Sequence, residues 1–462
     1  MNIFENISNG YKRIATGIAI VSFLAILYFS MLPGASLAAP GGVYAASGEG
    51  IGGAIVKLVA WPQYTATTSD GSGAIPIGEY TIPEVPEGTY FITASKEGYT
   101  TNLSTVTVTG LTTVTRNFTL TPGYNWYFAE GSISDATDAY VQLSNPGNTP
   151  VNVDVRFMLT DGTVVTNSSV LPANTTGVVD AKTVLPTPSY FAINVLSDNK
   201  IGAERTMVFS AMNWGGKIVD DVHDTVGVAE LNTTWYFAEG SITPDTYAYI
   251  QILNPNAYQA NVTVQYMKTD GSVVTTSKLV SATSRDYFDP RSVLSVPSYF
   301  SVKVTSDIPI MSERTMVFVN MNWGGKIING LHDTIGSPEL SRTWYFAEGS
   351  ITSDTFAYIQ ILNPNPDPAT VTVEYMKTDG TVVTTSKVVG RTSRDYFDPR
   401  TNLTPLPQYF SVKVTSDIPI MSERTMVFAN MNWGGKIING FHDTIGSTRL
   451  NNTWSLGGGR VD

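Results

Sequence analysis

The sequence contains no cysteine among its 462 residues, and this absence excludes thiol catalysis, cysteine-ligated zinc, iron–sulfur clusters and disulfide bonds together. Histidine is almost as scarce, with three in the chain, and charged residues make up only 15% of it. The formal net charge is −11, and no basic stripe accompanies it. The sequence therefore argues against nucleic acid and anionic lipid as partners, because both require a concentration of positive charge.

The chain also lacks the long runs of alanine, glutamate, lysine and leucine that are typical of helical proteins. Threonine, serine, valine, tyrosine, asparagine and glycine dominate instead, and 42% of the residues are hydrophobic. This composition favours β-strands joined by tight turns. The length predicts about three or four domains, each large enough to be stabilised by a buried core without disulfides.

One long hydrophobic run lies near the N-terminus. Lys12 and Arg13 precede an apolar stretch at residues 14–32, and small residues follow it. A short basic region, a hydrophobic core and a small-residue exit are typical of a secretory signal, so cleavage is predicted after Ala38, with Ala45 as a second position. The alternative is an uncleaved membrane anchor, because a run of about 19 residues is near the lower limit for spanning a bilayer. Both interpretations place the rest of the chain at the cell surface or in the extracellular space.

Residues 48–122 are predicted to form a small antiparallel β-sandwich, after a linker at residues 39–47. Short alternating segments are separated here by Asp-Gly, Pro-x-Gly and Glu-Gly turns. The segments 85–90 (Val-Pro-Glu-Gly-Thr-Tyr) and 94–99 (Ala-Ser-Lys-Glu-Gly-Tyr) resemble the carboxypeptidase regulatory-like family. The resemblance implies a transthyretin-like sandwich that acts as a spacer or display module, and it implies no catalytic residue.

The remainder of the chain is a tandem repeat. The sequence Trp-Tyr-Phe-Ala-Glu-Gly begins at Trp126, Trp235 and Trp344, which are 109 residues apart, and a shorter echo follows at Trp454. A period of this length is too long for a solenoid turn and indicates tandem domains. The complete domain prediction is a signal segment or anchor at 1–38, the linker, the first sandwich, repeats at 123–231, 232–340 and 341–450, and a tail or partial strand at 451–462.

Each repeat is predicted to be an immunoglobulin-like sandwich of about seven strands without the usual cysteine pair. In the second repeat, residues 254–256 (Asn-Pro-Asn) mark a turn, and residues 269–271 (Thr-Asp-Gly) mark a hairpin between two alternating runs. The opening motif together with a closing His-Asp resembles a repeat of exported bacterial cell-envelope proteins of actinobacterial type. The resemblance implies a surface or secreted array and supplies no ligand.

The second and third repeats are nearly copies, because residues 301–337 and 411–447 differ at two of 37 positions. Such identity indicates recent duplication and says little about which residues matter. The first repeat has diverged, so the features it retains are more informative. It keeps the opening motif, a Glu-Arg pair, a Trp-Gly-Gly loop and the closing His-Asp.

The three histidines, His223, His332 and His442, occur once per repeat, and an aspartate follows each of them. One interpretation is a metal site or a catalytic His–Asp pair. Adjacent residues of an extended strand point to opposite faces, so the two side chains would not reach one ion, and no Gly-x-Ser-x-Gly nucleophile motif is present. A histidine that caps a turn or bonds to backbone is favoured. The sequence thus predicts no catalytic residue, no metal ligand and no cofactor.

A glutamate and an arginine of each repeat lie at the ends of apolar strand faces, where an unpaired charge would be costly. In the second repeat, Arg314 shares a strand face with Met316 and Phe318. We expect the two charges to pair within each repeat, across the edge of the sandwich. The predicted pairs are Glu130 with Arg205, Glu239 with Arg314, and Glu348 with Arg424. The alternative is a pair between neighbouring repeats, such as Arg314 with Glu348.

A Trp-Gly-Gly loop in each repeat contains Trp214, Trp323 or Trp433. Exposed tryptophans beside polar loops suit carbohydrate, so these three are the candidate glycan-binding residues. The alternative is a Gly-Gly hairpin whose tryptophan packs on the core. An exposed Trp323 would favour glycan binding, and a buried one would exclude it.

These features together predict a non-enzymatic exported array of β-sandwich domains that serves as an adhesin, a stalk or a matrix component. Short junctions between rigid tandem sandwiches are expected to give an extended rod. The alternative function is binding of cell-wall polysaccharide through the Trp-Gly-Gly loops, with avidity from three weak sites. The expected partners are cell-wall or extracellular polysaccharides or surface proteins, and the membrane only through an uncleaved N-terminal segment. An enzyme is disfavoured because no set of nucleophile, base and orienting residue is present.

Overall fold

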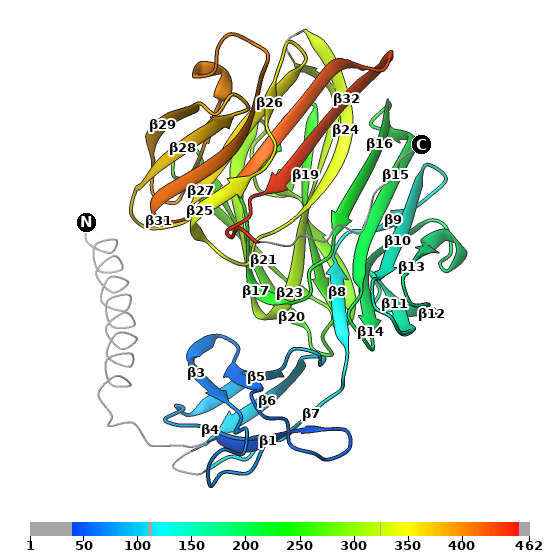
Figure 1. Cartoon of the computed structure of the whole chain (residues 1–462), viewed down its shortest axis with the longest axis vertical. Helices are drawn as coiled ribbons and strands as arrows, with labels where there is room; N and C mark the ends of the chain where they lie inside the picture. The colour runs from blue at the N-terminus through cyan, green and yellow to red at the C-terminus, as the bar shows by residue number, and fades with distance from the viewer. Residues whose placement is uncertain (1–38, 110–112, 324, 452–462) are drawn as a thin grey trace, which may run out of the picture. The chain divides into compact units, whose positions relative to one another are not determined.

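The computed structural model describes residues 39–109, 113–323 and 325–451 (Figure 1). The predicted signal segment and the echo at Trp454 lie outside the described residues. The described chain is all-β, as predicted, and its strands are interrupted only by turns, loops and three short 3-10 helices. Within these ranges, no helix is long and apolar enough to cross a membrane.

The first of two compact units ends at residue 121 and is a β-sandwich. One sheet has the strand order β4-β1-β7 and the other the order β3-β2-β5-β6. The strands are β1 (Ala39–Ala45), β2 (Ile55–Leu58), β3 (Trp61–Thr67), β4 (Glu79–Ile82), β5 (Gly88–Ser95), β6 (Asn102–Val108) and β7 (Phe118–Leu120).

Strand β1 corrects the prediction of a linker at residues 39–47. It pairs antiparallel with β4 and parallel with β7, so it belongs to the first sandwich. Glycine-rich composition is typical of linkers, but here glycine permits close packing of the backbone. A Cβ atom at Gly41 would lie 1.8 Å from the carbonyl oxygen of Arg116.

The first repeat, in the second compact unit, is a sandwich of two antiparallel sheets. One sheet has the order β13-β10-β15-β16 and the other the order β12-β11-β14-β8, with the short β9 beside β14. The strands are β8 (Tyr124–Phe128), β9 (Ser132–Ile133), β10 (Thr137–Asn145), β11 (Val151–Leu159), β12 (Val164–Leu171), β13 (Thr175–Asp180), β14 (Ser189–Ser197), β15 (Gly202–Trp214) and β16 (Lys217–Val226). A short 3-10 helix, η1 (Ala181–Thr183), follows β13.

The second and third repeats have the same plan, except that one strand of 26 residues takes the place of β14 and β15 and passes through both sheets. The strands of the second repeat are β17 (Asn232–Phe237), β18 (Ser241–Ile242), β19 (Thr246–Asn254), β20 (Ala260–Lys268), β21 (Val273–Val280), β22 (Ser284–Phe288), β23 (Ser298–Trp323) and β24 (Lys326–Ile335). Those of the third are β25 (Ser341–Phe346), β26 (Ser350–Ile351), β27 (Thr355–Asn363), β28 (Ala369–Lys377), β29 (Val382–Val389), β30 (Ser393–Phe397), β31 (Gln408–Trp433) and β32 (Lys436–Ile445). The 3-10 helices η2 (Pro290–Ser292) and η3 (Pro399–Thr401) correspond to η1.

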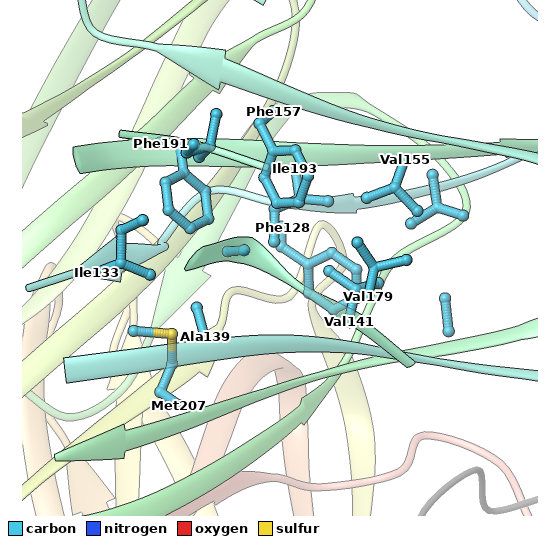
Figure 2. Packing of buried hydrophobic residues seen from close by; sticks show 14 of the residues in the cluster. Phe128, Ile133, Ala139, Val141, Val155, Phe157, Val179, Phe191, Ile193 and Met207 are labelled. Atoms are coloured by element: carbon cyan, nitrogen blue, oxygen red, sulfur yellow. The ribbon is translucent and has the colours of Figure 1, made fainter. Parts of the chain in front are cut away.

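The core of the first repeat lies between its two sheets (Figure 2). Phe157 and Phe191 meet edge to face with 5.2 Å between ring centroids, and Phe128 of the opening motif is fully buried in the same cluster. Val317 and Leu331 of the second repeat also belong to this cluster. Hydrophobic burial therefore continues across the boundary between repeats.

Neighbouring repeats lie side by side along their closing strands, with β24 between β16 and β32 (Figure 1). Phe318 of the second repeat stacks on Phe441 of the third, with 4.0 Å between ring centroids. The core of the third repeat likewise includes Ala238 and Met267 of the second. This arrangement corrects the expectation of sandwiches that meet only at short junctions, because each repeat buries part of the sheet surface of the next.

Candidate functional site at the repeat junctions

A Glu-Arg dipeptide in the middle of one strand links the second repeat to both of its neighbours. In β23, Glu313 and Arg314 are adjacent and so point to opposite faces of the sheet. Glu313 pairs with Arg205 of the first repeat. Arg314 pairs with Glu423 of the third. The dipeptide therefore reaches backward and forward along the array at once.

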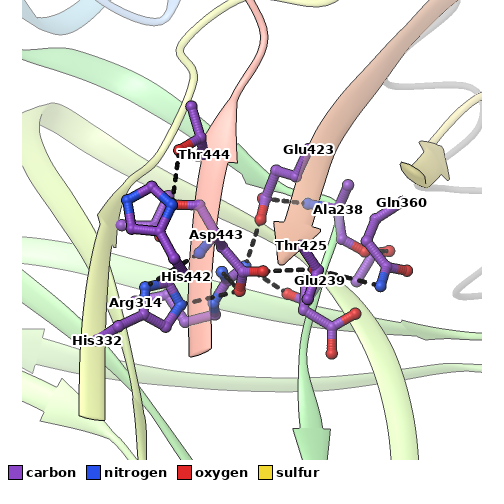
Figure 3. A network of polar contacts seen from close by, with 12 residues as sticks. Ala238, Glu239, Arg314, His332, Gln360, Glu423, Thr425, His442, Asp443 and Thr444 are labelled. Carbon is purple, nitrogen blue, oxygen red and sulfur yellow. Dashed lines mark hydrogen bonds and ion pairs between the residues drawn. The ribbon is translucent and has the colours of Figure 1, made fainter. Parts of the chain in front are cut away.

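At the junction between the second and third repeats, Arg314 is enclosed by carboxylates of the third repeat (Figure 3). Its Nη1 lies 2.9 Å from Oε2 of Glu423, and its Nη2 lies 2.7 Å from Oδ2 of Asp443. Nη1 also donates to the backbone carbonyl of Glu239 in its own repeat at 2.7 Å. The side chains of the arginine and of its two carboxylate partners are 0% exposed, so each charge depends on the others for its stability.

The junction between the first and second repeats has the same geometry. Nη1 of Arg205 lies 2.7 Å from Oε2 of Glu313, and its Nη2 lies 3.1 Å from Oδ2 of Asp333. Nη1 also donates to the backbone carbonyl of Glu130 at 2.6 Å. Because one buried network recurs at two junctions, the repeats dock on one another in a defined way.

The opening motif supplies the other half of each junction. In the second repeat, the backbone N–H of Ala238 donates to Oε1 of Glu423 at 2.6 Å. The carboxylate of Glu239 accepts from Nη2 of Arg394 at 2.7 Å, and both side chains are almost completely buried. The motif thus binds the following repeat with one backbone donor and one side-chain acceptor.

Two other positions hold the motif in place within its own repeat. Trp235 is fully buried, and its Nε1 donates to the carbonyl of Ile310 at 2.9 Å. Gly240 lies so close to the ring of Phe300 that an added Cβ would be 2.5 Å from it. These contacts explain why the motif requires a tryptophan at its start and a glycine at its end.

Two of the three ion pairs expected within a repeat are wrong in their side-chain partners. They are Glu130 with Arg205 and Glu239 with Arg314. In each pair only the backbone carbonyl of the glutamate accepts a hydrogen bond from the arginine. Its carboxylate binds an arginine of the following repeat instead, Arg285 at 2.9 Å or Arg394 at 2.7 Å. The physical reason is that the neighbouring sheet brings a cation closer to the carboxylate than the same repeat does.

Arg424 and Glu348, the pair expected in the third repeat, lie together with 2.8 Å between Nη1 and Oε2. No further repeat follows in the described part of the chain. The side chain of Glu348 is 59% exposed, whereas that of the equivalent Glu239 is 7% exposed. The alternative partner for Arg314 was a glutamate of the next repeat, and the next repeat does supply one, but it is Glu423 rather than Glu348.

The His-Asp dipeptide of the second repeat is also divided between the two neighbours. Asp333 binds the arginine of the first repeat, whereas Nε2 of His332 lies 2.9 Å from Oδ2 of Asp443 in the third. Its Nδ1 also accepts a hydrogen bond from the backbone N–H of Asp443 at 3.4 Å, so His332 bonds to backbone as predicted, but to that of another repeat, and it does not cap a turn of its own. His223 bonds instead to the hydroxyl of Thr225 at 2.6 Å. Across the described ranges, no group of three histidine or acidic side chains is placed to hold a metal ion.

Burial and charge act in opposite directions on the carboxyl groups of the junctions. Burial raises the pKa of Glu130 to about 7, and the guanidinium of Arg285 opposes this shift. Burial also favours a raised pKa for Asp443, but His332 and Arg314 outweigh it and lower the pKa to about 2. Asp443 therefore remains ionised near neutral pH and keeps its pairing with the arginine.

The Trp-Gly-Gly loops lie at the junctions as well. Trp214 meets Tyr247 and Tyr249 of the second repeat edge to face, with ring centroids 5.7 and 6.0 Å apart. Trp323 meets the two equivalent rings of the third repeat at 5.9 and 5.7 Å. Both indoles are half-buried. The side chain of Trp433 is outside what the structure describes.

This placement bears on the glycan-binding interpretation. The loop of the first repeat is a two-residue hairpin, in which Gly215 and Gly216 have φ values of 58° and 83°, as a type I′ turn requires. The packing alternative therefore describes Trp214 and Trp323 better, because both indoles meet rings of the neighbouring repeat and Trp214 also packs against the core cluster of the first repeat. Glycan binding through these loops stays a prediction.

One open cavity of about 390 Å³ lies where the ends of the closing strands of all three repeats meet. It is lined by Val226, Ile335, Trp344 and Ile445 together with residues of the adjoining turns. Glu339 is the one carboxylate in its lining. Its lining also includes Ser337, Ser447 and Thr448, but it holds no histidine, lysine or second carboxylate to activate their hydroxyl groups.

Comparison with protein families finds that part of the first unit is similar to a known domain. The PEGA domain model matches residues 78–124. The match covers β4 to β7, so it concerns the first sandwich and not the repeats. The carboxypeptidase regulatory-like resemblance of the same unit stays a prediction. A comparison with curated proteins finds no match.

Several solved structures match the chain at very low similarity. A Thermotoga maritima protein designated 1070 has a TM-score of 0.21 and 17% identity, and the match covers 23% of this chain and 93% of that one. BcpA, the major pilin subunit of Bacillus cereus, has a TM-score of 0.14 and 12% identity, with 65% and 95% covered. A tetra-tandem repeat in the extending region of a large adhesion protein has a TM-score of 0.11 and 11% identity, with 90% and 100% covered. Scores this low carry no functional argument.

Sequence reasoning missed the acidic and basic residues that complete the junctions. They are Arg285, Glu313, Asp333, Arg394, Glu423 and Asp443. The sequence did contain a signal for Glu313 and Asp333, which are adjacent to Arg314 and His332. Adjacent residues of a strand face opposite ways, so each dipeptide could contact two neighbours. Arg285 and Arg394 gave no such signal, since their strand carries no repeated motif in the first repeat.

Proposed function

We propose that this chain is a non-enzymatic exported protein whose three repeats form a locked β-sandwich array at the cell surface or in the extracellular matrix. The buried ion network that recurs at both junctions is the observation that carries the proposal. Domains that bind ligands independently need no such network, and their interfaces are usually small and polar. A chain that must hold its domains in a fixed relation benefits from one, because it specifies a single docking geometry.

The sequence supports both the export of the protein and its class as a cell-surface or matrix array. The basic, apolar and small-residue order before residue 39 is typical of an export signal, and the acidic, cysteine-free composition suits a protein that relies on burial for stability. The resemblance of the repeats to those of exported bacterial cell-envelope proteins points the same way. Within this class, the array serves as a stalk, an adhesin or a matrix component, and the first sandwich serves as a spacer or display module.

Localisation tests the proposal most directly. Antibodies against the repeats should label intact cells of the producing organism or their medium, and protease added to intact cells should remove the label. A cytoplasmic protein that is protected from external protease would contradict export. Deletion of the gene should reduce attachment or matrix cohesion without loss of a metabolic activity.

Binding to polysaccharide is tested in parallel. The full chain is incubated with washed envelopes and compared with its Trp323→Ala and Trp433→Ala variants. Retention that Trp433→Ala weakens more than Trp323→Ala would support a glycan site on the third repeat, because Trp323 already contacts a neighbour. Retention that neither substitution affects would support attachment by another surface.

A further inference from the structure

The surface that receives the next repeat is exposed in the third repeat. In the second repeat, Ala238 and His332 are 0% and 1% exposed because the third repeat covers them. The equivalent residues of the third repeat, Ala347 and His442, are exposed. The sequences of the two repeats are almost identical here, so the third repeat presents a complete docking surface with no repeat on it in the described chain.

The charge of this surface is also incompletely paired. Arg424 is the equivalent of Arg314, which has two fully buried carboxylates of the next repeat around its guanidinium. Arg424 has Glu348 of its own repeat at 2.8 Å, and that side chain is mostly exposed. The side chain of Arg424 is 9% exposed beside this glutamate, at a position that acidic residues of the following repeat enclose at both internal junctions.

The complementary surface is exposed in the first repeat. Asp224 occupies the position of Asp333 and Asp443 on the closing strand, and it is exposed where they are buried. Val222 and Val226 flank it on the same face of β16 and are 62% and 50% exposed. Leu331 and Phe441, which occupy the position of Val222, are 4% and 9% exposed because a preceding repeat covers them.

The side chain of Asp224 has the same threonine partner as Asp443, the equivalent aspartate at a junction. Its Oδ1 accepts from the hydroxyl of Thr206 at 2.5 Å, and Oδ1 of Asp443 accepts from Thr425 in the same way. In Asp443 the other oxygen, Oδ2, binds the arginine of the preceding repeat. The first repeat also keeps Glu204 at the position of Glu313 and Glu423, but this glutamate is 7% exposed. Asp224 is therefore the exposed acidic group that an arginine of a preceding repeat can reach.

We propose that chains associate head to tail, with the third repeat of one chain docked on the first repeat of a second copy. In this junction Arg424 of one chain pairs with Asp224 of the other. The exposed valines of β16 cover the apolar surface beside Arg424. The contact uses two different surfaces, so it is heterologous and builds rings or filaments from a single chain.

The junction between chains is weaker than the internal ones. Thr176 of the first repeat stands where Arg285 stands in the second, so no arginine reaches Glu348 across the contact. Asp138 stands in place of Tyr247, which removes one of the rings that meet a junction tryptophan. Association is therefore reversible and depends on concentration.

Sedimentation of the full chain over a range of concentrations tests the proposal. The wild type is expected to form dimers and longer species as concentration rises. Val222→Asp places an unpaired carboxylate in one half of the contact, and Ala347→Glu places one in the other half, beside the partner's acidic residues. Each should weaken association by about tenfold or more. The control is Val170→Asp, because this valine is 61% exposed and the equivalent Leu279 and Val388 stay exposed at the internal junctions.

Mixing the two variants distinguishes the geometry. Val222→Asp chains keep a working third repeat and Ala347→Glu chains keep a working first repeat, so their mixture should form dimers and nothing longer. A wild-type chain that remains monomeric at every concentration would overturn the proposal. So would association that Val222→Asp leaves unchanged, since that would indicate contact between two third repeats. Association that appears only after removal of residues 452–462 would assign the surface to that segment and also overturn it.

Discussion

Replacement of Arg314 by methionine should destabilise the junction between the second and third repeats by about 3–5 kcal/mol. The substitution leaves the carboxylate of Glu423 without its cation and leaves Asp443 with His332 alone, and both carboxylate side chains are fully buried. Removing one partner of a buried ion pair costs this much because the remaining charge is uncompensated. The matched control is Arg424→Met, whose partner Glu348 is 59% exposed. The arginine of this control pair is 9% exposed, but its glutamate is solvated and is not left as a buried charge when Arg424 is replaced. The control should therefore cost much less than Arg314→Met.

Hydrogen exchange of the full chain followed by mass spectrometry is the suitable assay, because a protein of several domains does not unfold in two states. Amides of β24 and β32 should exchange about 100-fold faster or more in Arg314→Met, since every 1.4 kcal/mol corresponds to a factor of ten. Adding Glu423→Gln and Asp443→Asn to Arg314→Met removes the uncompensated charges and should restore part of the protection. Equal effects of Arg314→Met and Arg424→Met would refute the reasoning.

Three other predictions follow from the same junctions. The pKa of Asp443 is lowered from 3.8 to about 2. Its contribution to folding stability is therefore present above pH 4 and is lost as pH falls toward 2. An acid titration of stability should show a loss of about 2 kcal/mol in this range, and Asp443→Asn should flatten the titration. Trp214→Ala should weaken the first junction by about 2 kcal/mol, measured as faster exchange in β16, because the indole packs on two tyrosines. Gly240→Ala should lower the melting temperature of the chain, with a cost of about 1–3 kcal/mol, because its Cβ would lie 2.5 Å from Phe300.

The all-β architecture was predictable because it depends on local patterns. Alternating apolar residues between Asp-Gly and Pro-containing turns specify strands wherever they occur, and the structure places strands on both sides of residues 269–271. The linker at 39–47 was wrong because composition does not reveal pairing by a glycine-rich backbone. Strand β1 is held by β4 and β7, which lie far from it in the sequence.

The ion pairs show where reasoning from one repeat stops. The position of Arg314 on an apolar face correctly indicates a buried charge that needs a partner, and the side chain is 0% exposed. The partner could not be placed, because Glu423 is 109 residues further along the chain and belongs to another domain. The way the repeats dock on one another decides which charges pair, and the residue pattern within one repeat does not predict that docking.

A double-mutant cycle between Arg314 and Glu423 tests the central claim that these charges lock neighbouring repeats together. The cycle compares Arg314→Met, Glu423→Gln and the double variant by hydrogen exchange in β24 and β32. A second cycle compares Arg314→Met, Glu239→Gln and their double variant in the same way, because Glu239 belongs to the same repeat as Arg314. We expect a coupling energy of about 2 kcal/mol or more for Arg314 with Glu423 and a smaller one for Arg314 with Glu239. A coupling to Glu423 that is no larger than the coupling to Glu239 would contradict the account.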